Sequence, residues 1–238
     1  MISRAHRWFA VLLVAVPSLL SGCQTRPTPG PAPKVERWKK EIAAFEASDR
    51  TNPPPRGAIL FTGSSTVRMW KTLAADFPGH RVVNRGFGGC RIEDVTHFAD
   101  RIVFPLEPRL IVIRGGGNDI ADGKSAERVA ADFRAFVKTV RSRLPGTEIA
   151  FLSQNPTVAR AQNEPVEREA NARIRRHVRW HRGLHYIDID RVSRGADGKP
   201  SDANLLPDHL HLNAEGYRLL AECVRPFLGP PDASAERH

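Results

Sequence analysis

Several common features are scarce or missing in this sequence of 238 residues, and each absence narrows what the chain can be. The apolar stretch from Trp8 to Leu20 is too short to span a bilayer comfortably. There is no internal repeat. No basic run is interleaved with aromatics, and the Lys and Arg residues behind the net charge of +10 are dispersed, which argues against nucleic-acid binding. The charge instead favours attraction to an anionic membrane or polysaccharide.

The N-terminal segment has the pattern of an export signal. Arg4 and Arg7 precede the apolar stretch, and small residues close it. A basic start, a short apolar middle and small residues before the cleavage point are typical of a signal peptide. We therefore expect residues 1–22 to be a signal peptide and residues 23–34, which are rich in proline, to form an extended tether.

The segment Leu20-Ser21-Gly22-Cys23 resembles the lipobox of bacterial lipoproteins, in which a diacylglycerol is attached to the cysteine thiol. The resemblance implies lipidation at Cys23 and a membrane-anchored chain. An ordinary signal peptide followed by a chance cysteine is the alternative. Residue 24 is glutamine and not aspartate, which by the same resemblance favours the periplasmic side of the outer membrane if the cell is Gram-negative.

Only two further cysteines are present, Cys90 and Cys223. An exported protein can form disulfides, but the sequence does not give the separation of the two thiols, so their pairing stays open. Cys90 follows a glycine-rich segment, and we expect it to be a small packing residue and not a second nucleophile.

Short apolar runs alternate with helical patterns along the rest of the chain. The clearest helical pattern has apolar residues at helical spacing from Val129 to Leu144. Apolar strands that alternate with helices are typical of a parallel sheet covered on both faces, so we expect one three-layer α/β/α domain. The predicted strands are 58–62, 81–84, 110–113, 148–152 and 184–189, and the predicted helices are 35–48, 66–76, 91–103, 129–144, 165–182 and 214–227.

Polar or glycine-rich segments follow four of the predicted strands. In an open parallel sheet, ligands bind at the carboxyl ends of the strands, so we expect these segments to converge on one rim. They are Gly63-Ser64-Ser65 after the first strand, Asn84 to Gly89 after the second, Gly115 to Asp119 after the third, and Asp208 to His211 after the fifth.

These segments contain the groups that hydrolysis by a serine requires. A serine hydroxyl needs a base, and the base needs an orienting carboxylate. The oxyanion of the tetrahedral intermediate needs donors already in place, and glycine lets a backbone N–H approach closely. Such a set is present in Ser65, Gly89, Asn118, Asp208 and His211. The Gly-x-Ser-x-Gly elbow that an α/β-hydrolase would require is missing.

The same segments resemble the four blocks of the SGNH/GDSL hydrolase family, in the family's order, across about residues 57–228. By this resemblance Ser65 is the nucleophile, His211 is the general base and Asp208 orients that base. The backbone N–H groups of Ser65 and Gly89, with the side chain of Asn118, form the oxyanion hole. One departure is a serine immediately before Ser65, where the family usually has aspartate, and it bears on substrate more than on activity.

The resemblance also implies a flavodoxin-like sheet of strand order 2-1-3-4-5 and a reaction that needs no cofactor. The hydrolase domain is then 35–228, and we expect residues 229–238 to be a disordered tail. The long polar stretch 191–207 offers no apolar lid, which favours a short acyl group on a glycan or another polar alcohol. The wider motifs resemble a branch of lysophospholipases and acetylhydrolases, so a lipid esterase is an alternative. An acyltransferase and a non-catalytic lipoprotein that binds glycan or lipid are further alternatives.

Simpler structural interpretations exist for several of these residues. Ser65 is a favoured N-cap residue for the helix that follows it. A metal site is a further alternative at two places, although the sequence shows no third cluster of ligands. The candidate ligands are Asp208, His209 and His211 in one place, and His177, His181 and His185 in the other.

Four arginines flank the motif segments, namely Arg68, Arg85, Arg91 and Arg114. A guanidinium group in such a place is either solvated or in contact with an anionic substrate, and the sequence favours neither interpretation.

Overall fold

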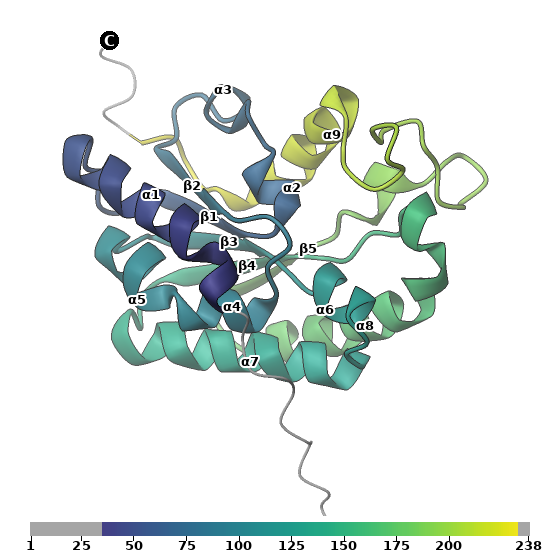
Figure 1. Cartoon of the computed structure of the whole chain (residues 1–238), viewed down its shortest axis with the longest axis horizontal. Coiled ribbons are helices and arrows are strands. Elements are labelled where there is room, and N and C mark those ends of the chain that lie inside the picture. The colour runs from purple at the N-terminus through teal and green to yellow at the C-terminus, as the bar shows by residue number, and fades with distance from the viewer. Residues whose placement is uncertain (1–34, 233–238) are drawn as a thin grey trace, which may run out of the picture.

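The structure, a computed structural model, describes residues 35–232. Five parallel strands form one sheet in the order β2-β1-β3-β4-β5, with helices on both faces (Figure 1). The predicted α/β fold and its strand order are therefore confirmed. The strands are β1 (Ile59–Gly63), β2 (Val82–Gly86), β3 (Leu110–Arg114), β4 (Glu148–Leu152) and β5 (Leu184–Ile187).

The helices divide between the two faces of this sheet. The α-helices are α1 (Lys39–Thr51), α2 (Ser65–Arg68), α3 (Leu73–Asp76), α4 (Ile92–His97), α5 (Ala99–Ile102), α6 (Gly117–Ala121), α7 (Ala126–Arg143), α8 (Glu164–Arg179) and α9 (Ala214–Val224). Short 3-10 helices are η1 (Val35–Trp38), η2 (Phe104–Leu106), η3 (Val158–Asn163), η4 (Asp190–Ser193) and η5 (Arg225–Phe227). Helices α1, α4, α5, α7 and α8 cover one face, whereas α2, α3 and α9 cover the other (Figure 1).

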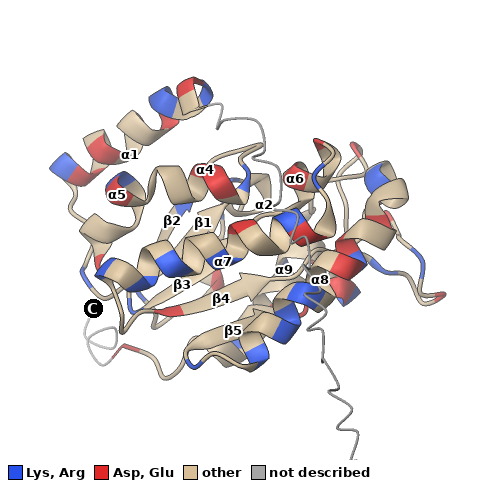
Figure 2. Cartoon of the chain, turned by 90° about the horizontal axis from the view of Figure 1, so that it is seen from below, with Lys and Arg blue, Asp and Glu red and all other residues tan. Residues whose placement is uncertain are grey.

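Alternate side chains of the strands enter two separate hydrophobic cores. In β1, Leu60 packs with the core under α7, and Phe61 packs with the core under α9. Every residue of β1 and β3 is buried. Because helices cover both faces, these strands appear in the sequence as continuous apolar runs, without the alternation of a half-exposed strand. The charged residues lie mainly on the outer helices, with both signs interspersed (Figure 2).

The boundaries of two predicted helices are wrong. The predicted helix 66–76 is two short helices, α2 and α3. The chain turns between them and buries Trp70, whose ring packs against Phe61 and Phe77 and whose indole N–H donates to Asp76 at 2.6 Å. The predicted helix 91–103 likewise divides at Phe98 into α4 and α5.

The ends of β1, β2 and β3 are level with one another. Gly63 pairs with Gly86 on one side and with Arg114 on the other, and each is the last residue of its strand. Gly63 has φ of +118°, and a Cβ there would lie 1.9 Å from the carbonyl oxygen of Arg114, so only glycine fits. The loops after these three strands therefore start from the same rim.

The first residues of the predicted C-terminal tail contact the domain through Asp232. The backbone N–H of Asp232 donates to the carbonyl of Gly79, and its carboxylate accepts from the backbone N–H of Arg81, both at 2.7 Å. The predicted signal peptide, the tether with Cys23 and the residues 233–238 lie outside the described residues. Within 35–232, no helix is both long and apolar enough to cross a membrane.

Candidate active site

Ser65 is the first residue of α2 and follows β1 directly. Ser64, and not Ser65, is the N-cap, so the simple capping interpretation of Ser65 is wrong. The hydroxyl oxygen Oγ of Ser65 lies 3.0 Å from Nε2 of His211. The phenol of Tyr217 on α9 donates to the carbonyl of Thr66 at 2.9 Å, and this bond fixes α2 against the helix that follows the His211 loop.

The imidazole of His211 is held from its other side by Asp208. Asp208 Oδ2 lies 2.6 Å from His211 Nδ1, and Oδ1 accepts from the backbone N–H groups of His211 at 2.9 Å and Leu210 at 3.0 Å. The backbone and ring of His211 hold the pKa of the Asp208 carboxyl down at about 2, so the group is ionised at neutral pH. With Nδ1–H donating to this carboxylate, the lone pair of Nε2 faces the Ser65 hydroxyl.

The histidines proposed as alternative metal ligands lie in other surroundings. His209 has φ of +58°, and its Nδ1 contacts Asp202 at 2.9 Å. The rings of His177, in the last turn of α8, and His181, just beyond that helix, are tilted against each other with centroids 4.0 Å apart, while His185 lies on β5. Among residues 35–232, no three His, Cys, Asp or Glu side chains are placed to hold a metal ion.

Gly89 and Asn118 lie opposite Ser65 on the same rim. Gly89 has φ of +77°, and no residue in the described range accepts a hydrogen bond from its backbone N–H or from that of Ser65. Asn118 Nδ2 donates to the carbonyl of Cys90 at 3.0 Å, and its Oδ1 accepts from Arg160 Nη1 at 3.2 Å and Nη2 at 3.3 Å. These bonds fix the orientation of the amide and leave its second N–H for a ligand.

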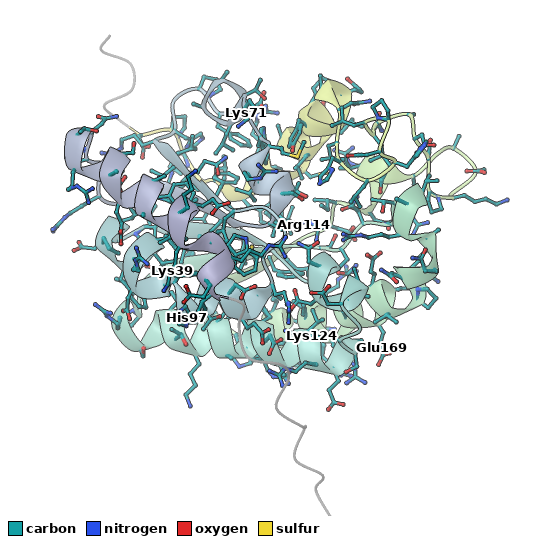
Figure 3. The ribbon with its side chains drawn as sticks, viewed as in Figure 1. Lys39, Lys71, His97, Arg114, Lys124 and Glu169 are labelled. Atoms are coloured by element: carbon teal, nitrogen blue, oxygen red, sulfur yellow. The ribbon has the colours of Figure 1, made fainter. Side chains whose placement is uncertain are left out.

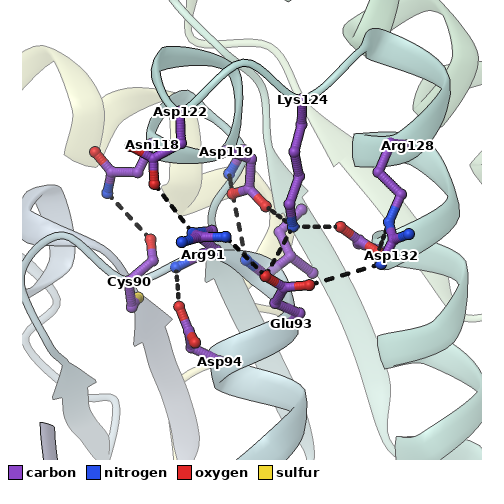
Figure 4. Close-up of polar contacts among 12 residues, drawn as sticks. Cys90, Arg91, Glu93, Asp94, Asn118, Asp119, Asp122, Lys124, Arg128 and Asp132 are labelled. Atoms are coloured by element: carbon purple, nitrogen blue, oxygen red, sulfur yellow. Dashed lines mark hydrogen bonds and ion pairs between the residues drawn. The ribbon is translucent and has the colours of Figure 1, made fainter. Parts of the chain in front are cut away.

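A buried carboxylate holds the segment around α6, which carries Asn118, in place (Figure 4). Asp119 is fully buried and accepts from the backbone N–H groups of Gly116 at 3.1 Å and Ile92 at 3.3 Å. Its other oxygen contacts Lys124 Nζ at 2.9 Å. Burial raises the pKa of Asp119, and the Lys124 ammonium opposes that rise.

Lys124 is shared by three carboxylates in this cluster. Its Nζ lies 2.9 Å from Asp119, 2.7 Å from Asp132 on α7 and 3.1 Å from Glu93 on α4. Burial alone would lower the pKa of Lys124, but Asp119 and Asp132 raise it. Arg91 also contacts Glu93, at 3.1 Å. The cluster thereby joins α4 and α7 to α6, the helix that carries Asn118.

One cleft of about 560 Å³ is lined by Ser65, Gly89, Asn118 and His211, with Asp208 behind His211. The structure therefore brings together all of the predicted site residues except Cys23, which lies outside the described residues. The model of the GDSL-like lipase/acylhydrolase family matches residues 54–219, which is more than half of the chain. The chain belongs to this family.

Solved structures similar to this GDSL-like acylhydrolase share its fold. A Streptococcus pneumonia protein, provisionally assigned as a platelet activating factor, has a TM-score of 0.71 at 20% identity, covering 82% of this chain and 94% of its own. A GDSL-like lipase from Bacteroides thetaiotaomicron has a TM-score of 0.65 at 17% sequence identity, and the match covers 81% of this chain and 96% of the lipase. A catalytic mutant of an acetylxylan esterase from Geobacillus stearothermophilus has a TM-score of 0.60 at 15% sequence identity, and the match covers 74% of this chain and 96% of the esterase. At these identities the likeness concerns the fold alone. No curated protein sequence matches the chain.

Two of the four arginines that flank the motifs of this acylhydrolase form ion pairs and do not line the cleft themselves. Arg85 pairs with Asp49 on α1, and Arg91 pairs with Glu93 and with Asp122, both at 3.1 Å. The ion pairs at these two positions favour a structural role over contact with a substrate. The other two, Arg68 and Arg114, do line the cleft.

Arg114 lies near the centre of the molecule, at the end of β3 (Figure 3). Its guanidinium donates to Gln154 Oε1 at 2.5 Å and to Asn155 Oδ1 at 2.9 Å. Burial lowers the pKa of Arg114 to about 10, so the group stays charged at neutral pH. Nearby, burial raises the pKa of Glu167 to about 7, although Arg114 and Arg160 oppose the shift.

Sequence reasoning missed several residues that line the acylhydrolase cleft. Asn155 and Arg160 come from the loop after β4, whose carboxyl end meets the same rim, and the strand-end rule would have found them if it had been applied there. Arg37, Trp38 and Glu167 come from helices outside the motif segments, and no local signal marks them. The free thiols of Cys90 and Cys223 form no disulfide, which settles the open pairing.

Proposed function

We propose that this chain is a serine ester hydrolase that works through an acyl-Ser65 intermediate. The observation that supports this most directly is the chain of hydrogen bonds from Asp208 to His211 at 2.6 Å and from His211 to Ser65 at 3.0 Å. In the proposed reaction, Ser65 Oγ attacks the ester carbonyl carbon while His211 Nε2 takes its proton, and His211 then returns that proton to the leaving alcohol. Asp208 orients the ring and stabilises the imidazolium.

The tetrahedral intermediates of this reaction carry a negative oxygen, which the proposed oxyanion hole would bind. Its donors are the backbone N–H groups of Ser65 and Gly89 and the second N–H of Asn118. After the alcohol leaves, water attacks the acyl group with His211 again as the base, and a carboxylic acid is released. Side chains and backbone supply every group in these steps, so we propose that the reaction uses no cofactor.

The proposed substrate is a short acyl group, such as acetyl, on a glycan or another polar alcohol. Polar side chains and backbone dominate the cleft lining, and its apolar members are few and scattered. These are Trp38, Ala121, Leu210 and Leu212. The acetylxylan esterase among the structural neighbours is named for substrates of this kind.

We further propose that the enzyme is anchored in the bacterial cell envelope by a lipid on Cys23, on the periplasmic side of the outer membrane if the cell is Gram-negative. The sequence Leu20-Ser21-Gly22-Cys23 supports this proposal.

A fluorophosphonate probe and an aryl acetate test the catalytic proposal. The variants are Ser65→Ala, His211→Ala, their double variant and, as a matched control, Ser142→Ala at an exposed serine on α7. We expect each single site variant to lose nearly all turnover and the double variant to lose little more, because hydroxyl and base act as a unit. The probe should label the wild type and Ser142→Ala but not Ser65→Ala.

Wild-type turnover in a folded Ser65→Ala variant would show that Ser65 is not the nucleophile. Analysis of the products in the presence of a sugar acceptor separates release of free acetate, which we expect, from transfer of the acetyl group to the sugar.

A further inference from the structure

Two arginines lie directly against the glycine loop that carries the proposed oxyanion donor. A Cβ at Gly88 would meet Arg68 Nε at 2.6 Å, and a Cβ at Gly89 would meet Arg37 Nη2 at 2.7 Å. Side chains at these two positions would therefore displace both guanidinium groups. Arg68 also lies on the same face of α2 as Ser65, because residues three apart on a helix are neighbours.

Neither Arg37 nor Arg68 has a carboxylate partner among residues 35–232. Arg37 stacks over the ring of Trp38, with 5.0 Å from Cζ to the ring centroid. The indole N–H of Trp38 in turn donates to the carbonyl of Gly88 at 2.9 Å. The loop, the tryptophan and the guanidinium thus form one assembly that faces the cleft.

The cleft as a whole has an excess of positive charge. Its lining includes four arginines, namely Arg37, Arg68, Arg114 and Arg160. The lining carboxylates are Glu41, Asp122 and Glu167, of which Asp122 is paired with Arg91, 3.1 Å away. Glu167 has a pKa raised to about 7 by burial and is only partly ionised near neutral pH. Clefts lined by charges of one sign concentrate ligands of the opposite sign.

We propose that the cleft takes esters whose alcohol part carries a carboxylate or a phosphate, and that Arg37 and Arg68 bind this group. The inference rests on the proposed esterase function and specifies its substrate class. A guanidinium group presents its N–H donors in a fork that matches the oxygens of such anions. The charge belongs to the alcohol part because a short acyl group such as acetyl carries none.

Three matched esters test this proposal. They are the tri-O-acetyl methyl glycosides of glucose, glucuronic acid and glucose 6-phosphate, which differ only at carbon six. We measure kcat/KM for acetate release with the wild type, Arg37→Gln, Arg68→Gln, Arg68→Lys and the double glutamine variant. The control is Arg134→Gln, which removes one exposed positive charge from α7, outside the cleft lining.

We expect the wild type to favour an anionic ester over the neutral one by roughly tenfold or more, because hydrogen bonds to charged groups are the stronger kind. The double glutamine variant should lose this ratio, Arg68→Lys should keep part of it, and Arg134→Gln should keep all of it. Raising the salt from about 0.05 to about 0.5 M should narrow the ratio through screening. Comparison of the two anionic esters tells whether carboxylate or phosphate is preferred.

Equal kcat/KM for neutral and anionic esters in the wild type would overturn the inference and leave the esterase function standing. If the wild type hydrolyses none of the three faster than Ser65→Ala, the esterase proposal has failed for this substrate class. In that case, binding of methyl glucuronoside and methyl glucose 6-phosphate to Ser65→Ala, measured by calorimetry, tests the anion site independently of catalysis. Binding that Arg37→Gln and Arg68→Gln abolish supports the site, and absence of binding overturns it.

Discussion

Arg160 holds the side-chain oxygen of Asn118 with both of its terminal nitrogens, at 3.2 and 3.3 Å. The two residues come from short helices after different strands, Arg160 from η3 after β4 and Asn118 from α6 after β3. Because the carbonyl of Cys90 takes one amide N–H of Asn118 at the same time, the amide is fixed at both ends. An oxyanion donor is effective when it is oriented before the reaction begins, and in the proposed oxyanion hole the bonds from Arg160 would orient Asn118 in this way.

Asn118→Ala should therefore lower kcat by about 10²–10³ while KM changes much less, as expected for a donor that acts in the transition state. Arg160→Met leaves the Asn118 amide held only by its bond to the Cys90 carbonyl, so we expect a smaller fall in kcat, on the order of tenfold. Both constants are measured with an aryl acetate. An unchanged kcat in Asn118→Ala would remove this residue from the oxyanion hole.

Lys124→Met should destabilise the protein by about 3–5 kcal/mol, because it leaves buried carboxylates without their shared cation. Its Nζ lies within 3.1 Å of Asp119, Asp132 and Glu93. The free energy of unfolding is measured in urea, with Lys138→Met on the exposed side of α7 as the control. Equal free energies of unfolding for the two variants would mean that the ion cluster makes no net contribution to stability.

Glu167 should make stability fall as the pH rises. Its pKa is about 7 in the fold against 4.5 for an ordinary glutamate, so between these values the folded state binds more protons than the unfolded state. Stability then decreases with pH across that window. Glu167→Gln should gain stability relative to the wild type between about pH 5 and about pH 8, as measured by urea unfolding at both values. Parallel pH profiles would contradict this. Asp208 has the opposite effect, because its pKa is lowered from 3.8 to about 2. Its contribution to stability is lost as the pH falls through these values, which lie below the pH range where Glu167 acts.

The sequence was sufficient to predict the convergence of Ser65, Gly89, Asn118 and His211, because each follows a parallel strand and such strands end at a common rim. It was not sufficient to predict the ion cluster around Lys124. A lysine among acidic residues has the same local pattern on a solvated helix as in a buried ion cluster, and only tertiary packing distinguishes the two.

The helix boundaries of α2 and α3 show a second limit of sequence reasoning. The pattern over 66–76 is compatible with one helix, but the chain turns between α2 and α3, where Trp70 is buried with its ring edge-on to Phe61 and Phe77. Packing of this kind depends on residues distant in the sequence, and it overrides local periodicity.

Aryl esters of increasing acyl length should show kcat/KM falling beyond about four carbons. Extra methylene groups that find no apolar pocket gain none of the ~0.8 kcal/mol available per buried CH₂. The measurement is a series from acetate to octanoate under identical conditions. A rise through eight carbons would reveal an apolar pocket and favour the lysophospholipase-like alternative.

Cys23→Ser should release the protein to the soluble fraction or leave an unprocessed precursor, because two or more acyl chains are needed for stable anchoring and the variant can carry none. Fractionation of cells and mass spectrometry of the mature N-terminus provide the readouts. Cys90→Ser, which alters a cysteine within the domain, is the control for general effects of thiol removal. A mature chain that begins at another residue without a lipid would refute the anchor.

The close approach of Gly63 to the Arg114 carbonyl has a consequence for how the sheet assembles. Because β1 and β3 are buried on both faces, a slip of one residue would only exchange side chains between two apolar cores, so hydrophobicity discriminates weakly between registers. If β1 slipped by one residue, a residue with a Cβ would take the place of Gly63. Its Cβ would lie 1.9 Å from the carbonyl oxygen of Arg114, which is too close. The slip would also displace Ser65 by about 3.3 Å along the strand direction, beyond hydrogen-bond reach of His211. Gly63 thus disfavours a slipped pairing of β1 with β3. A chain with that incorrect register could not bring Ser65 to His211.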